Sequence, residues 1–571
     1  MFHENVSTLL NEYIATLSDR TLPVVDLASP NDLKLAFANV GVATSLLDVL
    51  PTPVEKKENK TTPTNSGPHT NAALLRAVQL ILQKSVRTGH PQFYNQLYGR
   101  VNLISMAGDW ISTTTNTNGH TFECAPVATL LESEILTKVA HVIGGKYVHL
   151  QGSGGHDGLL VPGGSIANLY AMHVARYQKD PHIQTRGMNG GPQLVAYCSA
   201  SAHYSYLKTA RLLGIGSDNL RRVPVSSITG AMAIDVLAEM IAEDVNSGKV
   251  PFFIGSTAGT TVVGGYDDFK AIQKLANKYD IWHHVDACWG GAALLSPTLR
   301  YPCCDGIEDT DSISWNPHKM LGCALQTSIL LISDCGNSDG NQHPSTLTSA
   351  SASASASASE STLLSATGSG EGRHANLLSK ANGTHASYLF QPDKLFGNYD
   401  VGDKTIQCGR KTDSIKLWLM WKSLGDQGIA QSIEKCYSLA HYMVEKMMEL
   451  NKQTEDEKKW LFVVPPSCTN ICFWYVPKQL RPFVPSSFSE EEQDNKKGEG
   501  KDVKMHSVAP RIKASMQREG KAMIGFQTDV TVRDGHVNFF RMVFSSCETV
   551  EVMDVDKTLK DIAIAGEGLE F

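Results

Sequence analysis

The chain has 571 residues, of which 42% are hydrophobic and 19% charged, so we expect two or three packed globular units. Its net charge of -7 at pH 7 offers no basic surface for nucleic acid or an anionic membrane. We expect no signal peptide, and no window approaches the roughly 18 uninterrupted apolar residues of a membrane span. The twelve scattered cysteines indicate reduced thiols in a cytoplasmic protein rather than disulfides or a metal site.

The order of composition along the chain predicts three parts. The N-terminal residues read as an amphipathic helix, and a polar, proline-rich linker follows at about 50–69. We therefore expect an N-terminal helical segment with its linker over 1–120, a large domain over 121–425, and a smaller α+β domain over 426–571.

The large domain has the pattern of an α/β fold. Short apolar runs predict buried strands at 194–199, 252–257, 281–287 and 327–333. Between the middle two lies a helical pattern whose apolar positions share one face: Phe269, Ile272, Leu275 and Tyr279. A strand, helix and strand in this order imply a mainly parallel sheet covered by helices.

Two polar stretches interrupt the pattern. The segment at about 334–384 is rich in serine and alanine and buries too little apolar surface to offset its ordering entropy, so we expect a disordered surface insertion. A second polar insertion covers 489–504. Around it, helices at 414–425 and 431–450 and strands at 469–477 and 537–546 suggest the smaller domain.

A glycine turn and an aspartate are the first two signals of chemistry. Gly164 and Ser165 open a helix, whose free N–H groups and positive dipole end suit a phosphate, although such a turn is often only a cap. Asp286 ends a buried strand, where a carboxylate needs a partner. A protonated pyridine nitrogen is one such partner, and a helix cap is the alternative.

A lysine and a histidine complete the set. Lys319 follows His318 before an apolar strand; it either extends to the surface or, desolvated beside a cationic ring, becomes a Schiff-base nucleophile. His203 follows the strand at 194–199 and either stacks on a ring or is an ordinary core histidine. Each signal alone is ambiguous, but their order and their places at strand ends support one another.

These motifs resemble the group II pyridoxal-phosphate-dependent decarboxylases, in the glutamate, cysteine-sulfinate and aspartate branch. The similarity runs from about Thr88 to near the C-terminus and includes GHPQFYNQLYG, DWISTTTNTN, APVATLLE, STAGTTVVGGYD, VGDKTIQCGRKTDSIKLWLMWK and NFFRM. The resemblance implies a fold type I, aspartate aminotransferase-like α/β domain, a small C-terminal α+β domain, and pyridoxal 5'-phosphate as cofactor.

The resemblance also assigns roles in binding the cofactor. Lys319 would carry it as a Schiff base, and His203 would stack on its ring. The remaining contacts would come from Asp286 at the pyridine nitrogen, Thr261 beside the ring, and Gly164, Ser165 and His318 at the phosphate.

The same resemblance points to an acidic substrate. Arg541, in NFFRM, would bind a substrate carboxylate, for which its forked guanidinium is suited; an ordinary salt bridge is the alternative. Gln96 and Tyr98 would line the far wall from a neighbouring subunit. Glutamate decarboxylases tend to have serine and phenylalanine where this chain has Tyr98 and His120, so we expect a shorter acid, aspartate or cysteine sulfinate.

One residue departs from the family pattern. Phe396 stands where the family's mobile loop carries a tyrosine that protonates the substrate carbon after carbon dioxide leaves. Phenylalanine has no exchangeable proton, so Tyr399 or His203 would have to supply it. Failing that, reaction with oxygen would give an aldehyde by oxidative deamination.

The sequence therefore predicts a homodimeric amino-acid decarboxylase acting on a small acidic amino acid, with its active site at the subunit interface and no bound metal, nucleic acid or membrane. The alternatives are an oxidative aldehyde synthase, an aromatic amino-acid decarboxylase, against which Arg541 argues, and a non-catalytic scaffold. Retention of Lys319, Asp286 and His203 argues against the scaffold.

Overall fold

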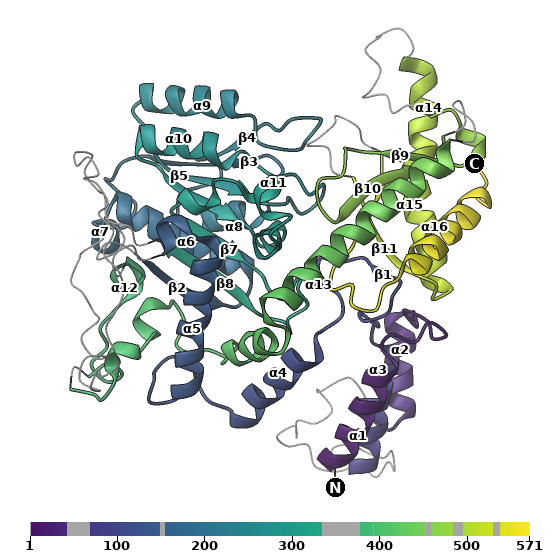
Figure 1. The fold of residues 1–571 in the computed structure, drawn as a ribbon, viewed down its shortest axis with the longest axis horizontal. Coiled ribbons are helices and arrows are strands. Elements are labelled where there is room, and N and C mark those ends of the chain that lie inside the picture. The colour runs from purple at the N-terminus through teal and green to yellow at the C-terminus, as the bar shows by residue number, and fades with distance from the viewer. Residues whose placement is uncertain are drawn as a thin grey trace, which may run out of the picture.

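The computed structural model describes residues 2–42, 69–148, 155–333, 377–391, 393–452, 458–483, 495–528 and 537–571. Two sheets organise these residues (Figure 1). The linker expected at about 50–69 lies outside the described residues apart from its last position, and so does 334–376 of the expected insertion.

The larger sheet has seven strands in the order β2-β8-β7-β6-β5-β3-β4. Strands β7, β6, β5, β3 and β4 run parallel to one another. Strand β8 is antiparallel to both of its neighbours, β7 and β2. Their bounds are β2 His156–Val161, β3 Leu194–Ser199, β4 Leu220–Val223, β5 Val250–Thr257, β6 Trp282–Asp286, β7 Ser312–Trp315 and β8 Ser328–Ser333.

Helices cover both faces of this sheet because alternate strand residues are apolar on each side. On β3, Val195 and Tyr197 pack toward α9 and α10, whereas Leu194, Ala196 and Cys198 pack toward α6 and α8. The helices of this region are α5 Pro126–Ile143, α6 Gly164–Lys179, α7 Ile183–Arg186, α8 Ser205–Leu212, α9 Ile234–Asn246, α10 Phe269–Tyr279 and α11 Arg300–Cys304.

The smaller sheet has the order β1-β11-β12-β10-β9. It is antiparallel except at its edge, where β1 from the N-terminal part pairs parallel with β11. Its strands are β1 Phe93–Tyr94, β9 Trp460–Phe462, β10 Asn470–Tyr475, β11 Met523–Gln527 and β12 Phe539–Val543, packed against α15 Val508–Arg518 and α16 Val552–Glu567.

A long helix connects the two parts. Helix α13, Ser414–Asn451, passes from the large sheet toward the small one (Figure 1), and Gly425 interrupts its helical geometry with a φ of 63°. The expected boundary between residues 425 and 426 falls at this break. The helices expected at 414–425 and 431–450 are the parts of α13 on either side of this break. Figure 1 also shows the N-terminal helices, α1 Phe2–Ala15, α2 Pro30–Asn39 and α3 Asn71–Lys84, beside the small sheet, and α4 Leu103–Thr115 below α13.

The structure corrects the end of the expected disordered insertion. Residues 377–382 form helix α12, Leu377–Asn382, in which Leu377, Leu378 and Ala381 are buried in the cluster that includes α6. Burial of these apolar residues stabilises the helix against α6. Within the second polar insertion, residues from 495 onward belong to α14, Asn495–His506. None of the helices among the described residues is long and apolar enough to cross a membrane.

Candidate active site

The carboxyl ends of adjacent parallel strands bring the predicted residues together. Asp286 ends β6, while His203 and Thr261 follow β3 and β5, and Lys319 follows β7. The register places Thr257 of β5 beside Asp286, and Asp286 beside Ser314 of β7. Ligands bind at this edge of open α/β sheets because loops from several strands meet there.

Asp286 is a buried carboxylate held ionised. Its Oδ2 accepts from Asn168 Nδ2 at 2.8 Å, and its Oδ1 accepts from the backbone N–H of Cys288 at 3.1 Å. Burial alone would raise its pKa, but His203, Lys319 and hydrogen bonds from the side chains of Asn168 and Cys288 outweigh burial and lower the pKa below the ordinary value. Each carboxylate oxygen keeps a lone pair for a further donor.

His203 is a mostly neutral ring near that carboxylate. Burial lowers its pKa, with Asp286 opposing and Lys319 reinforcing the shift. Its Nδ1 lies 2.9 Å from Ser205 Oγ and accepts from the Ser205 backbone N–H at 3.3 Å, which fixes the ring. The Tyr204 ring lies 4.2 Å from it, centroid to centroid.

The backbone of Lys319 is fixed by the other domain. Its carbonyl accepts hydrogen bonds from Ser545 Oγ at 3.1 Å and from Ser546 Oγ at 3.2 Å, just after β12. The single hydrogen of the Ser545 hydroxyl is shared with the carbonyl of Leu97, which lies 2.9 Å from Oγ. One hydroxyl thus joins Lys319 to the turn that carries Gln96 and Tyr98.

The turn before α6 lies close to the strand ends. A Cβ on Gly164 would overlap Cys288 Sγ and lie 2.9 Å from Asn316 Nδ2, so glycine is required there. Ser165, the next residue, is exposed at the helix N-terminus, whose first N–H groups have no partner within the helix. His318 is buried, its Nδ1 lies 2.5 Å from the carbonyl of Thr327, and burial lowers its pKa to about 4.

These residues fit a phosphate-bearing cationic ring such as pyridoxal phosphate. The absence of a Cβ on Gly164 lets this turn pack against Cys288 and Asn316, and the free N–H groups at the start of α6 suit the phosphate. The ionised Asp286, with a lone pair to spare, suits a protonated ring nitrogen. The Oδ1 of Asn316 is buried without a partner among the described residues, so its amide is available to a ligand beside Gly164.

Arg541 lies on β12 next to the loop after β5. Its Nη1 donates to the carbonyl of Thr261 at 2.9 Å and its Nη2 to the carbonyl of Asn95 at 3.4 Å. Its Nε is buried without a partner among the described residues, and burial lowers the pKa of the guanidinium. Gln96 beside it is exposed, and Tyr98 is half-buried with its ring 6.2 Å from that of Phe93.

His120 and Phe396 lie in a second cluster. The carbonyl of His120 accepts from the N–H of Val401 at 3.2 Å, and the rings of Phe396 and Tyr399 lie 5.5 and 5.3 Å from that of Phe122. None of the hydrogen bonds or ring contacts described for His120 or Phe396 reaches the residues around Lys319. His120 also lines a cavity of about 470 Å³ between α6, α12 and residues 402–408.

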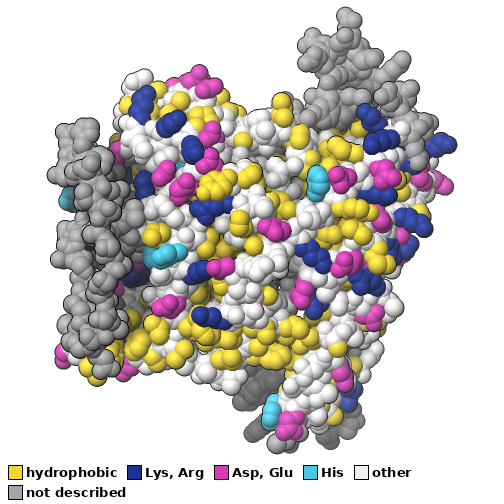
Figure 2. Space-filling model, viewed as in Figure 1, with side chains coloured by type: hydrophobic (Ala, Val, Ile, Leu, Met, Phe, Trp, Pro, Cys, Tyr) yellow, Lys and Arg dark blue, Asp and Glu magenta, His cyan; other side chains and the backbone are white. Residues whose placement is uncertain are grey.

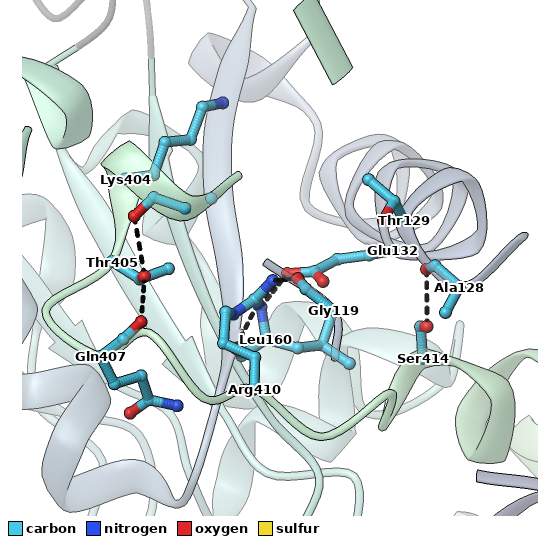
Figure 3. A network of polar contacts seen from close by, with 12 residues as sticks. Gly119, Ala128, Thr129, Glu132, Leu160, Lys404, Thr405, Gln407, Arg410 and Ser414 are labelled. Carbon is cyan, nitrogen blue, oxygen red and sulfur yellow. Dashed lines mark hydrogen bonds and ion pairs between the residues drawn. The ribbon is translucent and has the colours of Figure 1, made fainter. Parts of the chain in front are cut away.

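A buried ion pair anchors this second cluster (Figure 3). Arg410 Nη2 pairs with Glu132 Oε1 at 2.6 Å and donates to the carbonyl of Leu160 at 3.0 Å, while Nη1 donates to the carbonyl of Gly119 at 2.6 Å. Glu132 also accepts from the Leu160 N–H at 2.8 Å. The guanidinium thereby joins α5, β2 and the turn before His120.

Two asparagines near the site were not singled out from the sequence. Asn168 lies one helical turn after Gly164 and donates to Asp286, and Asn316 precedes Lys319 by three residues beside Gly164. Both stand inside motifs recognised in the sequence, so their spacing from Gly164 and Lys319 was the available signal. Lys513, whose Nζ donates to Asn95 Oδ1 at 3.2 Å close to Arg541, had no such signal.

Comparisons with known proteins show which family the chain resembles. A model described as the pyridoxal-dependent decarboxylase conserved domain matches residues 53–345 and 371–476. Human cysteine sulfinic acid decarboxylase is 36% identical over 497 residues, covering 87% of this chain and 86% of that protein. A glutamate decarboxylase of Drosophila melanogaster is 35% identical over 566 residues, covering 99% and 92%. The crystal structure of mouse CSAD matches with a TM-score of 0.78 at 32% identity, covering 100% of this chain and 98% of that one.

Proposed function

Because the chain belongs to the pyridoxal-dependent decarboxylase family and is a decarboxylase of amino acids, we propose that its substrate is a small acidic L-amino acid. Aspartate, giving β-alanine, and cysteine sulfinate, giving hypotaurine, are favoured, and glutamate, giving 4-aminobutyrate, comes after them. The relatives named above act on cysteine sulfinic acid and on glutamate, which supports the acidic class.

The observation that carries the proposal is the environment of Arg541. Its buried guanidinium donates to two backbone carbonyls, and no carboxylate among the described residues pairs with it. A buried cation without a counter-ion is costly, so a ligand that supplies a carboxylate is strongly favoured. Lys513 adds a second cation nearby. Its pKa is lowered mainly by burial and to a smaller extent by the charge of Arg541.

The preference for a shorter acid rests on Tyr98 and His120. The Tyr98 ring lies 6.2 Å from that of Phe93, three residues after Asn95, whose carbonyl accepts from Arg541, and a serine in its place would be smaller. His120 is 8% exposed, and its Nδ1 is buried without a partner among the described residues, so it can bind an acidic group if it reaches the pocket of a second subunit.

The chain's own residues divide the work at the reacting centre. The bound cofactor supplies an electron-withdrawing ring that accepts the electron pair left when carbon dioxide departs. Asp286 would hold a proton on the ring nitrogen, Lys319 would anchor the cofactor through its Nζ, and His203 would cover the ring face. Gly164, Ser165 and His318 would hold the phosphate, Thr261 would lie beside the ring, and Arg541 would bind the substrate carboxylate.

The test is turnover of aspartate, cysteine sulfinate and glutamate by the purified protein, with tryptophan as an aromatic control. We expect carbon dioxide release from the acids, aspartate or cysteine sulfinate being best. Arg541→Met should raise KM for the acids by about a hundredfold through loss of a charged bidentate contact, and Arg541→Lys by less. A preference for tryptophan would overturn the acidic class, and a clear preference for glutamate would overturn the shorter substrate.

We propose that the active unit is a homodimer. Helix α4 exposes Leu103, Ile104, Trp110 and Ile111 to between 40% and 45% of their surface. Figure 2 shows hydrophobic side chains gathered along the lower edge of this face, over α4. A contiguous apolar patch of this kind suits a self-complementary interface. Sedimentation of the purified protein should give twice the chain mass, and a monomeric active enzyme would contradict this.

Phe396 favours a second candidate, oxidative decarboxylation to an aldehyde. Its exposed ring carries no proton to donate, and Tyr399 on the same loop is the nearby hydroxyl. In that reaction the amino acid, oxygen and water become aldehyde, carbon dioxide, ammonia and hydrogen peroxide. Peroxide formed in step with carbon dioxide would support it, and amine as the only organic product would remove it.

A further inference from the structure

Polar side chains line one face of two neighbouring central strands. On β6, the alternation of a strand places Trp282, His284 and Asp286 on the same face. On β7, Ser312 and Ser314 also share a face, and the register sets them opposite His284 and Asp286, respectively. Helix α6 covers this face and contributes Asn168.

These side chains form a continuous series of hydrogen bonds. Trp282 Nε1 donates to Ser312 Oγ at 2.7 Å, and Ser312 Oγ lies 2.8 Å from His284 Nδ1. His284 Nε2 lies 3.0 Å from Asn168 Oδ1, and Asn168 Nδ2 donates to Asp286 Oδ2 at 2.8 Å. All five residues are at most 5% exposed.

The direction of every bond in the series is determined. An indole can only donate, so the Ser312 hydroxyl accepts from Trp282; the Asn168 amide, whose nitrogen faces the Asp286 carboxylate, presents its oxygen to His284 Nε2, so His284 Nδ1 accepts the Ser312 hydrogen. Burial lowers the pKa of His284 to about 4, so the ring is neutral and its single N–H is on Nε2. That N–H donates to Asn168 Oδ1, which leaves the amide nitrogen for Asp286.

The Asn168 amide cannot rotate without loss. Its Oδ1 also accepts from Ser314 Oγ at 3.0 Å, and its Nδ2 also donates to Ser205 Oγ at 3.0 Å. A rotated amide would set its oxygen against the Asp286 carboxylate and its N–H groups against the donors of His284 and Ser314. Such an arrangement in a water-free interior is strongly unfavourable.

We propose that Asn168 and His284 are positioning residues for the cofactor: His284 fixes the Asn168 amide, and Asn168 holds Asp286 in the orientation that binds the ring nitrogen. The inference rests on the proposed role of Asp286. His284 does not contact Asp286 within the series, because the Asn168 side chain lies between them. The inference nevertheless predicts that substitutions of His284 change the affinity for the cofactor and its absorption bands.

His283 provides a matched control on the same strand. It is also completely buried, and it makes two comparable hydrogen bonds, to Ser256 Oγ at 2.7 Å and Gln273 Oε1 at 2.8 Å, but on the opposite face of the sheet. His283→Leu and His284→Leu therefore remove similar hydrogen bonds, and only the second interrupts the series to Asp286.

The experiment titrates pyridoxal phosphate into the cofactor-free full-length variants, following the affinity and the visible absorption bands of the bound cofactor. His284→Leu should weaken affinity by about tenfold or more and change the ratio of the bands, because an Asn168 amide that is no longer fixed weakens its hydrogen bond to the charged Asp286. His283→Leu should stay within about twofold of the parent. His284→Gln, whose amide N–H can replace Nε2–H, should restore most of the affinity and the parent spectrum.

Milder variants cover the case in which the leucine variants do not fold. Ser312→Ala removes the donor to His284, and Ser256→Ala removes the hydrogen bond to His283. We expect the spectrum to change only for Ser312→Ala. Equal behaviour of the two members of either pair would overturn the inference. Asp286→Asn distinguishes failure of the proposed role of Asp286 from failure of the inference about Asn168 and His284. If Asp286→Asn leaves cofactor binding intact, the proposed role of Asp286 fails. If Asp286→Asn is the one variant that disturbs binding, the inference about Asn168 and His284 fails and the role of Asp286 stands.

Discussion

The pH dependence of stability gives a direct test of the buried histidines. His283 is completely buried between Ser256 and Gln273, and burial lowers its pKa from 6.5 to about 3. In the unfolded chain the same imidazole takes up a proton as the pH falls below 6.5, but in the folded chain it does not. The unfolded state therefore binds more protons between these two values, and the protein becomes less stable as the pH falls.

The size of the effect follows from the two pKa values. At pH 5 the unfolded imidazole is protonated and the folded one is neutral, which costs about 2 kcal/mol of unfolding free energy relative to neutral pH. His283→Gln removes this titration. The difference in unfolding free energy between about pH 7.5 and pH 5 should therefore be smaller in the variant by about 2 kcal/mol.

Urea unfolding of the parent and the variant at both pH values measures this difference. Because each protein is compared with itself at two pH values, the other titrating groups and the hydrogen bonds that the substitution removes cancel. His441→Gln serves as the control, because the His441 side chain is 74% exposed rather than buried. An equal pH dependence in the parent and His283→Gln would refute the reasoning.

Three further predictions follow from the site. Gly164→Ala should weaken binding of pyridoxal phosphate, and Cys288→Ala in the same chain should recover part of it by removing the sulfur that the new Cβ meets; an unchanged dissociation constant would contradict the packing. Arg410→Met should lower the unfolding free energy by about 3–5 kcal/mol because Glu132 is left buried and unpaired, as a chemical denaturation curve will show. Phe396→Tyr supplies a phenolic proton and should lower the amount of peroxide formed per carbon dioxide released. An unchanged ratio would show that Phe396 does not cause the oxidation.

Much of the fold was predictable because the spacing of apolar residues along the chain indicates where strands and helices form. The strand expected at 194–199 is β3, the run at 252–257 lies within β5, and the runs at 281–287 and 327–333 contain β6 and β8. The comparisons confirm the resemblance to the decarboxylase family and the fold type I class that it implied. The two-residue strand β1 was missed because its pairing with Met523 and Ile524 joins distant parts of the chain and leaves no local pattern.

The site was predictable where chemistry and strand ends coincide, as at Asp286 and Lys319. The hydrogen bonds behind it were not, because Ser312 and Asn168 are ordinary residues until the register of β6 and β7 and the packing of α6 bring them together. Helix α12 was likewise missed, because the sequence around residues 377–382 is mostly serine-rich, although Leu378 within the helix is completely buried.

Reduction of the protein with borohydride in the presence of pyridoxal phosphate, followed by peptide mapping, tests the central claim most directly. Lys319 lies close enough to lower the pKa of Asp286, so a cofactor held by that carboxylate should become fixed to the Lys319 side chain. We expect the pyridoxyl group on the peptide that contains Lys319. A pyridoxyl group on another lysine, or none on the protein, would contradict the account.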